Sequence, residues 1–260
     1  MKRVMKYSLL VTMGLAVVGC SKEPSRSSGS DEREKGQKSP KVQEHKKVQL
    51  WKDGPYWAET NIGAEKPWEF GYYFWWGDTV GYKWENGKWV ASDGSSSGFS
   101  FDKKNTPTSG KDNSALRREG WITEGEFLAP EHDAAHVQWG GGWRMPTDQE
   151  MDDLCQKCEW TWTTLRGVEG SIVRGRGDYA SSYIFLPAAG SGGGTSLKYI
   201  GVNGIYWSSV PYPATSLFSE SESWTLYSFG TDDTTYYKYR SGRFSRGSGY
   251  PVRPVQGFTK

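Results

Sequence analysis

The chain has 260 residues and a formal net charge of +2, from 32 Lys and Arg against 30 Asp and Glu. This balance excludes a strongly basic nucleic-acid-binding protein, so we expect no nucleic-acid partner. The 15% aromatic content and the 33 glycines predict a loop-rich domain whose core consists of aromatic rings. The three cysteines are too few for a disulfide framework.

Residues 1–19 have the pattern of a bacterial lipoprotein signal peptide. Basic residues precede an apolar run at 8–18, which is too short to span a bilayer. The run ends at Val17-Val18-Gly19-Cys20, which looks like a lipobox, so Cys20 is the predicted lipidation site. Several acyl chains would anchor the protein stably. An ordinary secretory signal, or an N-terminal helix with a chance cysteine, is the alternative.

Residues 20–47 are predicted to form a disordered tether. Residues 21–47 contain almost no apolar side chain and therefore cannot bury enough surface to offset the entropy of ordering. From Val48 the composition changes abruptly, and we expect one folded domain over residues 48–260.

The first part of this domain is rich in aromatic residues and turns. Residues 50–60 predict a hairpin turning at Asp53-Gly54-Pro55, and residues 82–90 predict another turning at Asn86-Gly87. The dense aromatic segment 67–78 lies between them. Most of its rings are expected in the core, but aromatic faces also suit sugar rings. The candidate ligand-stacking residues are Trp51, Trp75, Trp76 and Trp84.

Residues 91–120 have few apolar side chains and predict a long excursion across the surface. Such loops in compact domains are usually functional or mobile, so this segment is a candidate binding loop.

Residues 128–139 predict a helix with Pro130 at its first position, and with Ala134 and Val137 on the buried side. His132 and His136 are then four residues apart on one face, a spacing typical of zinc ligands. The usual glutamate base is replaced by an aspartate, and no third ligand follows at a fixed offset. We therefore expect two ordinary helix histidines, with no metal and no cofactor.

A glycine turn at Gly140-Gly141-Gly142 is predicted to end that helix, and a second helix follows. Thr147 and Glu150 match a capping box. Cys155 and Cys158 fall on the apolar face of the second helix. They are interpreted first as buried thiols, then as a disulfide, and last as a redox pair.

The remainder predicts strands at residues 160–163, 171–173, 182–186, 204–209, 224–229 and within 236–255. The turn after the second strand carries Arg176-Gly177-Asp178, which could engage an integrin-like partner, although tripeptides often arise by chance. The segment 191–195 is interpreted as a glycine loop. It lacks the residues of a phosphate-binding loop.

An ordered set of motifs carries a family resemblance. The set comprises Trp57-Ala58, Asn61-x-Gly63-Ala64, Gly71-x-Tyr73-Phe74-x-Trp76-Gly77, Asp133-Ala134-Ala135, Trp139-Gly140-Gly141-x-Trp143-Arg144-Met145-Pro146-Thr147, Leu186-Pro187-Ala188-Ala189-Gly190, Gly204-x-Tyr206-Trp207-Ser208-Ser209 and Val252-Arg253-Pro254-Val255. Together they resemble the Fibrobacter succinogenes major paralogous domain of exported bacterial lipoproteins. That family is similar to the C-type-lectin-like fold, in the branch shared with formylglycine-generating proteins. The resemblance implies an α+β domain with two helices, twisted antiparallel sheets and long loops.

The resemblance implies no known reaction. The calcium-dependent sugar-binding elements of lectins and the reactive cysteines of formylglycine-generating enzymes have no counterpart here. The leading hypothesis is a non-enzymatic binding or adhesion module. It would be lipid-anchored in the bacterial cell envelope, at the outer membrane or cell surface, with a glycan or surface protein as ligand. The alternatives are a degenerate relative of the formylglycine-generating enzymes, a metal hydrolase using the two histidines, and a structural component of a surface assembly.

Overall fold

The computed structural model describes residues 44–95, 97–213, 221–230 and 239–257. Contacts divide the chain into Met1–Val42 and Gln43–Lys260, and only the second unit is described here. Within it strand predominates over helix, and every pairing between described strands is antiparallel, so the domain belongs to the α+β class. No described helix is long and apolar enough to cross a membrane. The predicted signal peptide, Cys20 and most of the tether lie outside the described residues.

The first sheet joins the two ends of the domain in the order β1–β2–β16–β6, where β1 is Lys47–Gln49, β2 Tyr56–Ala58, β16 Val255–Gln256 and β6 Trp143–Arg144. The hairpin predicted over residues 50–60 is present, but its first strand begins earlier, at Lys47, which lies opposite Ala58. The His45 ring stacks on Trp139 with centroids 3.6 Å apart. The folded unit therefore begins before the expected boundary at residue 48.

The second sheet has the order β15–β3–β4–β5, with β15 at Tyr250–Pro251, β3 at Tyr73–Phe74, β4 at Tyr82–Glu85 and β5 at Lys88–Ala91. Asn86 and Gly87 have φ angles of 51° and 80°. Positive φ at both central residues is what a type I′ turn requires, which confirms the predicted hairpin.

The prediction of a glycine loop at residues 191–195 is wrong. These residues belong to a hairpin formed by β10, Ser191–Gly193, and β11, Ser196–Lys198. Phe101 bridges to Gly194 in this hairpin. A Cβ on Gly192 would lie 2.6 Å from the Phe101 ring, so the glycine there permits close packing.

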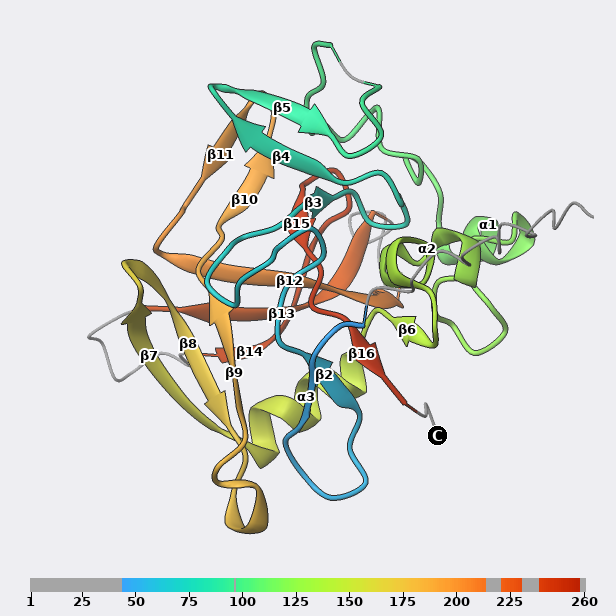
Figure 1. Cartoon of the computed structure of the whole chain (residues 1–260). Helices are drawn as coiled ribbons and strands as arrows, with labels where there is room; N and C mark the ends of the chain where they lie inside the picture. Colours follow the sequence, from blue (N-terminus) through green and yellow to red (C-terminus); the bar gives the residue numbers. More distant parts are fainter. Residues whose placement is uncertain (1–43, 96, 214–220, 231–238, 258–260) are drawn as a thin grey trace, which may run out of the picture. The chain divides into compact units, whose positions relative to one another are not determined.

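Two three-stranded sheets confirm the strands predicted between residues 160 and 229 (Figure 1). One contains β7 Glu159–Leu165, β8 Val168–Arg174 and β9 Tyr183–Pro187. The other contains β12 Asn203–Pro211, β13 Glu222–Phe229 and β14 Tyr239–Ser245. Of the strand pair predicted within 236–255, residues 236–238 lie outside the described residues, and residues 239–245, 250–251 and 255–256 are strands of three different sheets.

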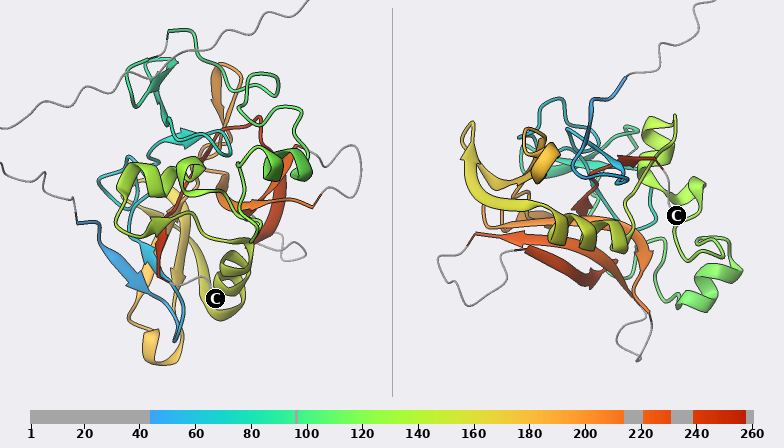
Figure 2. Two further views of the ribbon diagram at one scale, coloured as in Figure 1. Left: turned by 90° about the vertical axis from the view of Figure 1, so that its right-hand side faces the viewer. Right: turned by 90° about the horizontal axis from the view of Figure 1, so that it is seen from below.

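The helices are α1 Asn113–Arg118, α2 Ala134–Trp139 and α3 Asp148–Lys157, with 3-10 turns η1 Pro130–His132 and η2 Gly177–Tyr179. Figure 2 shows α3 lying along the sheet β12–β13–β14. The expectation of two helices is wrong, because α1 lies within the segment that was expected to cross the surface without structure. That segment also contributes Phe101 and Leu116 to the core, since both are almost fully buried.

The predicted continuous helix over residues 128–139 is also wrong. Asp133 has extended φ and ψ angles and caps α2, so η1 and α2 are separate elements. Its carboxylate accepts hydrogen bonds from the backbone N–H groups of Ala135 and His136. Ala134 and Ala135 are buried, whereas Val137 is 48% exposed instead of buried.

The turn Gly140-Gly141-Gly142 joins α2 to β6, and all three glycines have positive φ. Trp139 and Trp143 meet edge to face across it, with ring centroids 5.2 Å apart. The turn therefore positions the start of β6, and the strand leads directly into the N-terminus of α3.

Candidate functional site

The structure separates the four candidate stacking residues. Trp76 is fully buried and its indole N–H donates to the Ser208 carbonyl at 2.9 Å. Trp75 is 7% exposed and packs among other aromatic rings. Neither ring offers a face to a ligand, so these two predictions are wrong, because both rings pack the core. Trp84 is half-buried and lines a hollow of about 230 Å³.

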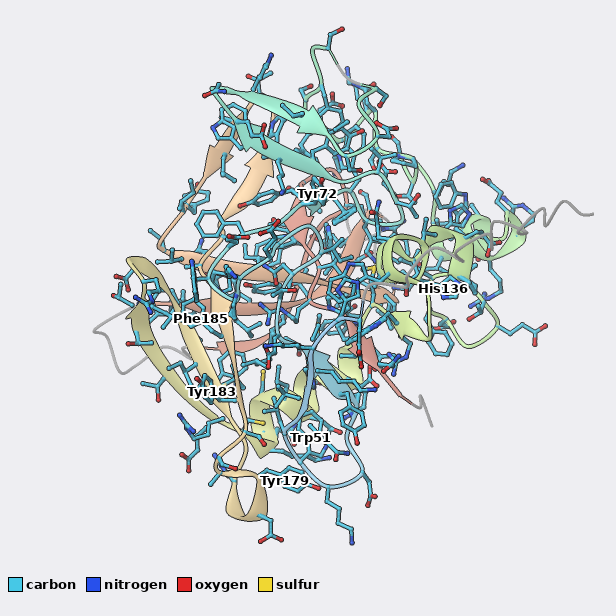
Figure 3. The ribbon with its side chains drawn as sticks, viewed as in Figure 1. Trp51, Tyr72, His136, Tyr179, Tyr183 and Phe185 are labelled. Atoms are coloured by element: carbon cyan, nitrogen blue, oxygen red, sulfur yellow. The ribbon has the colours of Figure 1, made fainter. Side chains whose placement is uncertain are left out.

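Trp51 lines a groove of about 780 Å³. We call it the acidic groove. It is formed by the β1–β2 turn at residues 51–55, the chain at 124–127, and residues 147–150, 153 and 157 at the start of α3 and along it, together with Val210. Figure 3 labels Trp51 in the β1–β2 connection, near α3. Three segments far apart in sequence thus share one concave surface.

The β1–β2 turn is shaped by its glycine. Asp53 has a φ of 59°, and a Cβ on Gly54 would lie 2.4 Å from the Trp51 ring. Only glycine lets the backbone pass so close to the indole. The Lys157 ammonium lies 5.5 Å from the centroid of the same ring, a cation–π arrangement. Trp51 is therefore held firmly, with 9% of its surface exposed.

Carboxylates dominate the lining of the acidic groove, with Lys52 and Lys157 as its cations. Three of the carboxylates have cationic partners: Glu150 with Arg144, Asp153 with Lys157, and Glu126 with Arg117. The other three take part in no ion pair between described residues: Asp53, Glu124 and Asp148. The groove therefore has an excess of negative charge.

The floor of the groove is the N-terminus of α3. Thr147 Oγ1 accepts from the Glu150 N–H at 3.2 Å, and Glu150 Oε2 accepts from the Thr147 N–H at 2.9 Å. This confirms the capping box predicted from the sequence. Arg144 donates to both oxygens of Glu150, at 2.8 and 2.6 Å, which ties β6 to the helix start. These contacts hold the site rigidly before any ligand arrives.

Asp148 is the first residue of α3 and faces the groove. Burial raises the pKa of its carboxyl above the ordinary value. The N–H of Gln149 opposes this shift, and Asp152 adds to it. A partly desolvated carboxylate without an ion partner accepts hydrogen bonds strongly. Together with the Gln149 amide it can bind hydroxyl groups of a ligand.

A second hollow of about 330 Å³ adjoins the groove, and both are lined by Phe127 and Thr147. We call it the apolar pocket. It is lined by residues of η1, α2 and β6, among them His136 of α2, which Figure 3 labels. Its apolar lining residues are Phe127, Leu128, Pro130, Trp143 and Met145, and Asp133 and Arg144 also line it.

His132 and His136 do not share a helix face. His132 belongs to η1 and stacks on Trp121, with ring centroids 3.9 Å apart. Burial lowers the pKa of His132 below its ordinary value, and Glu131 opposes this shift. In the described part of the chain, no group of three or more His, Cys, Asp or Glu is arranged to hold a metal ion.

Cys155 and Cys158 are unpaired thiols, as the first interpretation of the sequence predicted. Burial raises the pKa of both to about 12, so neither is a ready nucleophile at neutral pH. Arg176, Gly177 and Asp178 are exposed at η2, and the Arg176 guanidinium donates to the Cys158 carbonyl at 3.2 Å. One side chain of the tripeptide is thus engaged within the domain.

No known protein family, curated protein or solved structure matches this chain. The function of the site therefore has to follow from its geometry. The sequence pointed to Trp51 but missed the turn at 123–128, which lines both hollows. The glycine within Glu124-Gly125-Glu126 could have indicated this turn from the sequence.

Proposed function

We propose that this protein is a lipid-anchored protein of the bacterial cell envelope whose C-type-lectin-like domain binds glycans in the acidic groove. The ordered motifs from Trp57 to Val255 and the α+β class support the lectin-like assignment. Several of the motif residues are fully buried core residues, among them Trp57, Trp76, Trp207 and Arg253. Because these motif residues pack the core, the resemblance bears on the fold rather than on a reaction.

The observation that carries the proposal is the composition of the groove. A cleft of about 780 Å³ is lined by six carboxylates, the Gln149 amide and two ammonium groups. Sugars present many hydroxyl groups, which such a set of hydrogen-bonding side chains complements. The negative charge of the groove favours neutral glycans over anionic ones.

A glycan array probed with the full-length protein in detergent tests this proposal. We expect binding to neutral glycans, and we expect Asp148→Asn to weaken it by about 5–10-fold, since one charge-assisted hydrogen bond is lost. The matched control is Glu159→Gln, an exposed carboxylate on β7 outside the groove, which should leave binding unchanged. Failure of the array to register any glycan, or equal effects of the two variants, would contradict the proposal.

A further inference from the structure

Three exposed hydrophobic side chains lie close together in the connection between β11 and β12. Tyr199 is 61% exposed, Ile200 47% and Val202 51%. They are three of the six large hydrophobic side chains that are exposed in the described part of the chain, and the other three lie singly on β2, α2 and β9. We call these three residues the apolar turn. Single exposed hydrophobic side chains are ordinary, whereas a group of them is typical of an interaction surface.

The backbone of the apolar turn is fixed by hydrogen bonds. The carbonyl of Tyr199 accepts from the N–H groups of Val202 at 3.2 Å and of Asn203 at 3.1 Å. The Gly201 N–H donates to the Ala188 carbonyl at 2.9 Å, which ties the turn to the chain after β9. Because the backbone is held in this way, the three side chains are displayed to the outside of the domain before any partner arrives.

Tyr199 has a strained backbone conformation. Its φ of 60° lies in the left-handed region, which is unfavourable for a bulky side chain. Burial of the ring does not offset this cost, because most of the ring is exposed. Strain of this kind concentrates at functional sites. The conformation therefore points to a contact that the ring makes outside the domain.

Cations border the apolar turn. Lys198 directly precedes it, is exposed, and takes part in no ion pair between described residues. The hairpin β7–β8 lies beside the turn (Figure 1), since a Cβ on Gly201 would lie 3.9 Å from Glu169 Cγ. Arg166 is exposed in the turn of that hairpin. Cationic side chains around an apolar group suit the phosphate layer of a lipid surface.

The size of the apolar turn argues against a protein partner. Three side chains, each about half exposed, offer roughly a few hundred Å², whereas a stable protein–protein interface buries roughly 800 Å² on each partner. A lipid surface needs no such area, because acyl chains and headgroups rearrange around whatever is inserted. Tyrosine is also enriched at the boundary between headgroups and acyl chains, where its ring and its hydroxyl are both accommodated.

The predicted lipid anchor would hold the domain close to such a surface. The sequence predicts an acylated Cys20 and an unstructured tether before Glu44, in residues outside the described part of the chain. A flexible tether of this length spans roughly 30 Å on average. The effective concentration for a second contact with the same membrane is then on the order of millimolar, so a small apolar contact suffices.

We infer that the apolar turn is a membrane-contact site, at which Tyr199, Ile200 and Val202 insert into the interfacial layer of the bilayer that holds the acylated Cys20. This inference rests on the proposed membrane anchorage and adds the face of the domain that meets the bilayer. None of the three residues lines the acidic groove, so glycan binding and membrane contact use separate surfaces.

Fluorescence quenching by spin-labelled lipids tests the inference. The full-length acylated protein is reconstituted in vesicles of phosphatidylethanolamine and phosphatidylglycerol, with an environment-sensitive dye attached to Ile200→Cys. The matched control is Val137→Cys, since Val137 on α2 is 48% exposed and Ile200 47%. Burial raises the pKa of Cys155 and Cys158 to about 12, so these thiols react little with the dye at neutral pH. We expect a blue shift and lipid quenching at position 200, and neither at position 137.

A second variant separates membrane contact from folding. Tyr199→Asn and Val202→Ser, combined with the labelled Ile200→Cys, should abolish the blue shift and the quenching. Asparagine adopts a positive φ more readily than tyrosine, and Val202 is exposed, so the Tm should not fall. Tyr199→Trp keeps an interfacial aromatic ring and should retain both signals.

Three results would overturn the inference. The first is a protein that floats with the vesicles but shows equal quenching, or none, at positions 200 and 137. The second is full quenching at position 200 in the combined Tyr199→Asn/Val202→Ser variant. The third is a blue shift that appears without vesicles and grows with protein concentration, which would assign the turn to contacts between copies of the chain. A wild-type protein that does not float with the vesicles would instead contradict the proposed anchorage, and the inference would fall with it.

Discussion

Arg253 is the clearest case of a charged side chain used for structure. It is fully buried, and its guanidinium donates to Asn61 Oδ1 at 2.8 Å and to the carbonyls of Ala58, Glu59 and Phe185 at 2.9–3.1 Å. Burial lowers its pKa to about 10, and Tyr206 and Glu59 oppose this shift. The planar fork of donors thus links residues around β2, β9 and the C-terminal segment.

Arg253→Lys should destabilise the domain strongly. A lysine ammonium carries the charge but cannot reach four acceptors spread around a guanidinium, so buried carbonyls lose their partners. We expect a loss of about 3 kcal/mol and a fall in Tm of roughly 10 °C. Thermal unfolding monitored by tryptophan fluorescence measures this. Arg174→Lys is the control: its guanidinium is more exposed, donates to the Ala180 carbonyl and lies over the Tyr183 ring, where a lysine ammonium can also lie, so the Tm should change by less than about 2 °C. Similar shifts in the two variants would refute the assigned role.

Because the thiols of Cys155 in α3 and Cys158 at its C-terminus are buried, we expect the domain to lose stability at alkaline pH. Burial raises the folded pKa of both thiols to about 12, above the ordinary thiol value of 9.0, so the unfolded state releases its protons first as pH rises. The thiols therefore contribute stability that is complete below pH 9 and is lost as pH rises from 9 towards 12. Urea denaturation at pH 8, 9.5 and 10.5 should show a steeper decline for wild type than for Cys155→Ala/Cys158→Ala. Parallel curves would show that the thiols do not carry this pH dependence.

Among the helices, strands and turns, those that depend on residues close together in the sequence were predicted correctly. Asn86-Gly87 predicted a hairpin because two residues with positive φ suffice to make the turn. The break between η1 and α2 was missed, since alanines and a leading proline favour one continuous helix. Asp133 instead uses its carboxylate to cap α2 and to bind the Met145 N–H twelve residues away. That second contact is tertiary, and no local pattern reveals it.

The capping box of α3 can be tested by Thr147→Ala. The variant loses the hydrogen bond that the Glu150 N–H donates to Thr147 Oγ1, which should cost about 1 kcal/mol and lower the Tm by roughly 2–4 °C. Thr147→Ser retains the acceptor and should stay within about 0.5 kcal/mol of wild type. Chemical denaturation gives both values. If serine is as destabilising as alanine, packing of the threonine methyl rather than capping explains the effect.

At the scale of the whole molecule, the N-terminal residues are predicted to anchor the protein to a membrane. The lipobox pattern at Val17-Val18-Gly19-Cys20 predicts that acyl chains on Cys20 retain the protein at a membrane. Expressed in a bacterium with its own signal segment, Cys20→Ser should move the protein from the carbonate-washed membrane fraction to the soluble fraction. Cys155→Ser, in the folded domain, should leave fractionation unchanged. Retention of Cys20→Ser in the washed membrane would contradict lipidation.

The arrangement of the domain explains why aromatic residues were hard to assign from the sequence. Trp51, Trp75, Trp76 and Trp84 looked equivalent, because each stands in a glycine-rich aromatic stretch. Their surroundings differ only after folding: Trp76 donates to Ser208 of β12, Trp75 packs in an aromatic cluster, and Trp51 lines the acidic groove. Burial depends on contacts between distant segments, which composition and periodicity do not contain.

Short-range signals in the chain therefore predicted most strands, the α3 cap, the hairpin turns and the predominance of aromatic packing, because each depends on residues within a few positions of one another. The candidate site depends on tertiary structure. Pairing of β16 with both β2 and β6 brings the β1–β2 turn and the start of α3 to one end of the domain, and the Leu128–Ser209 bond draws in the turn at 123–128. A groove formed by segments about 70 and 20 residues apart exists only once those backbone hydrogen bonds have formed.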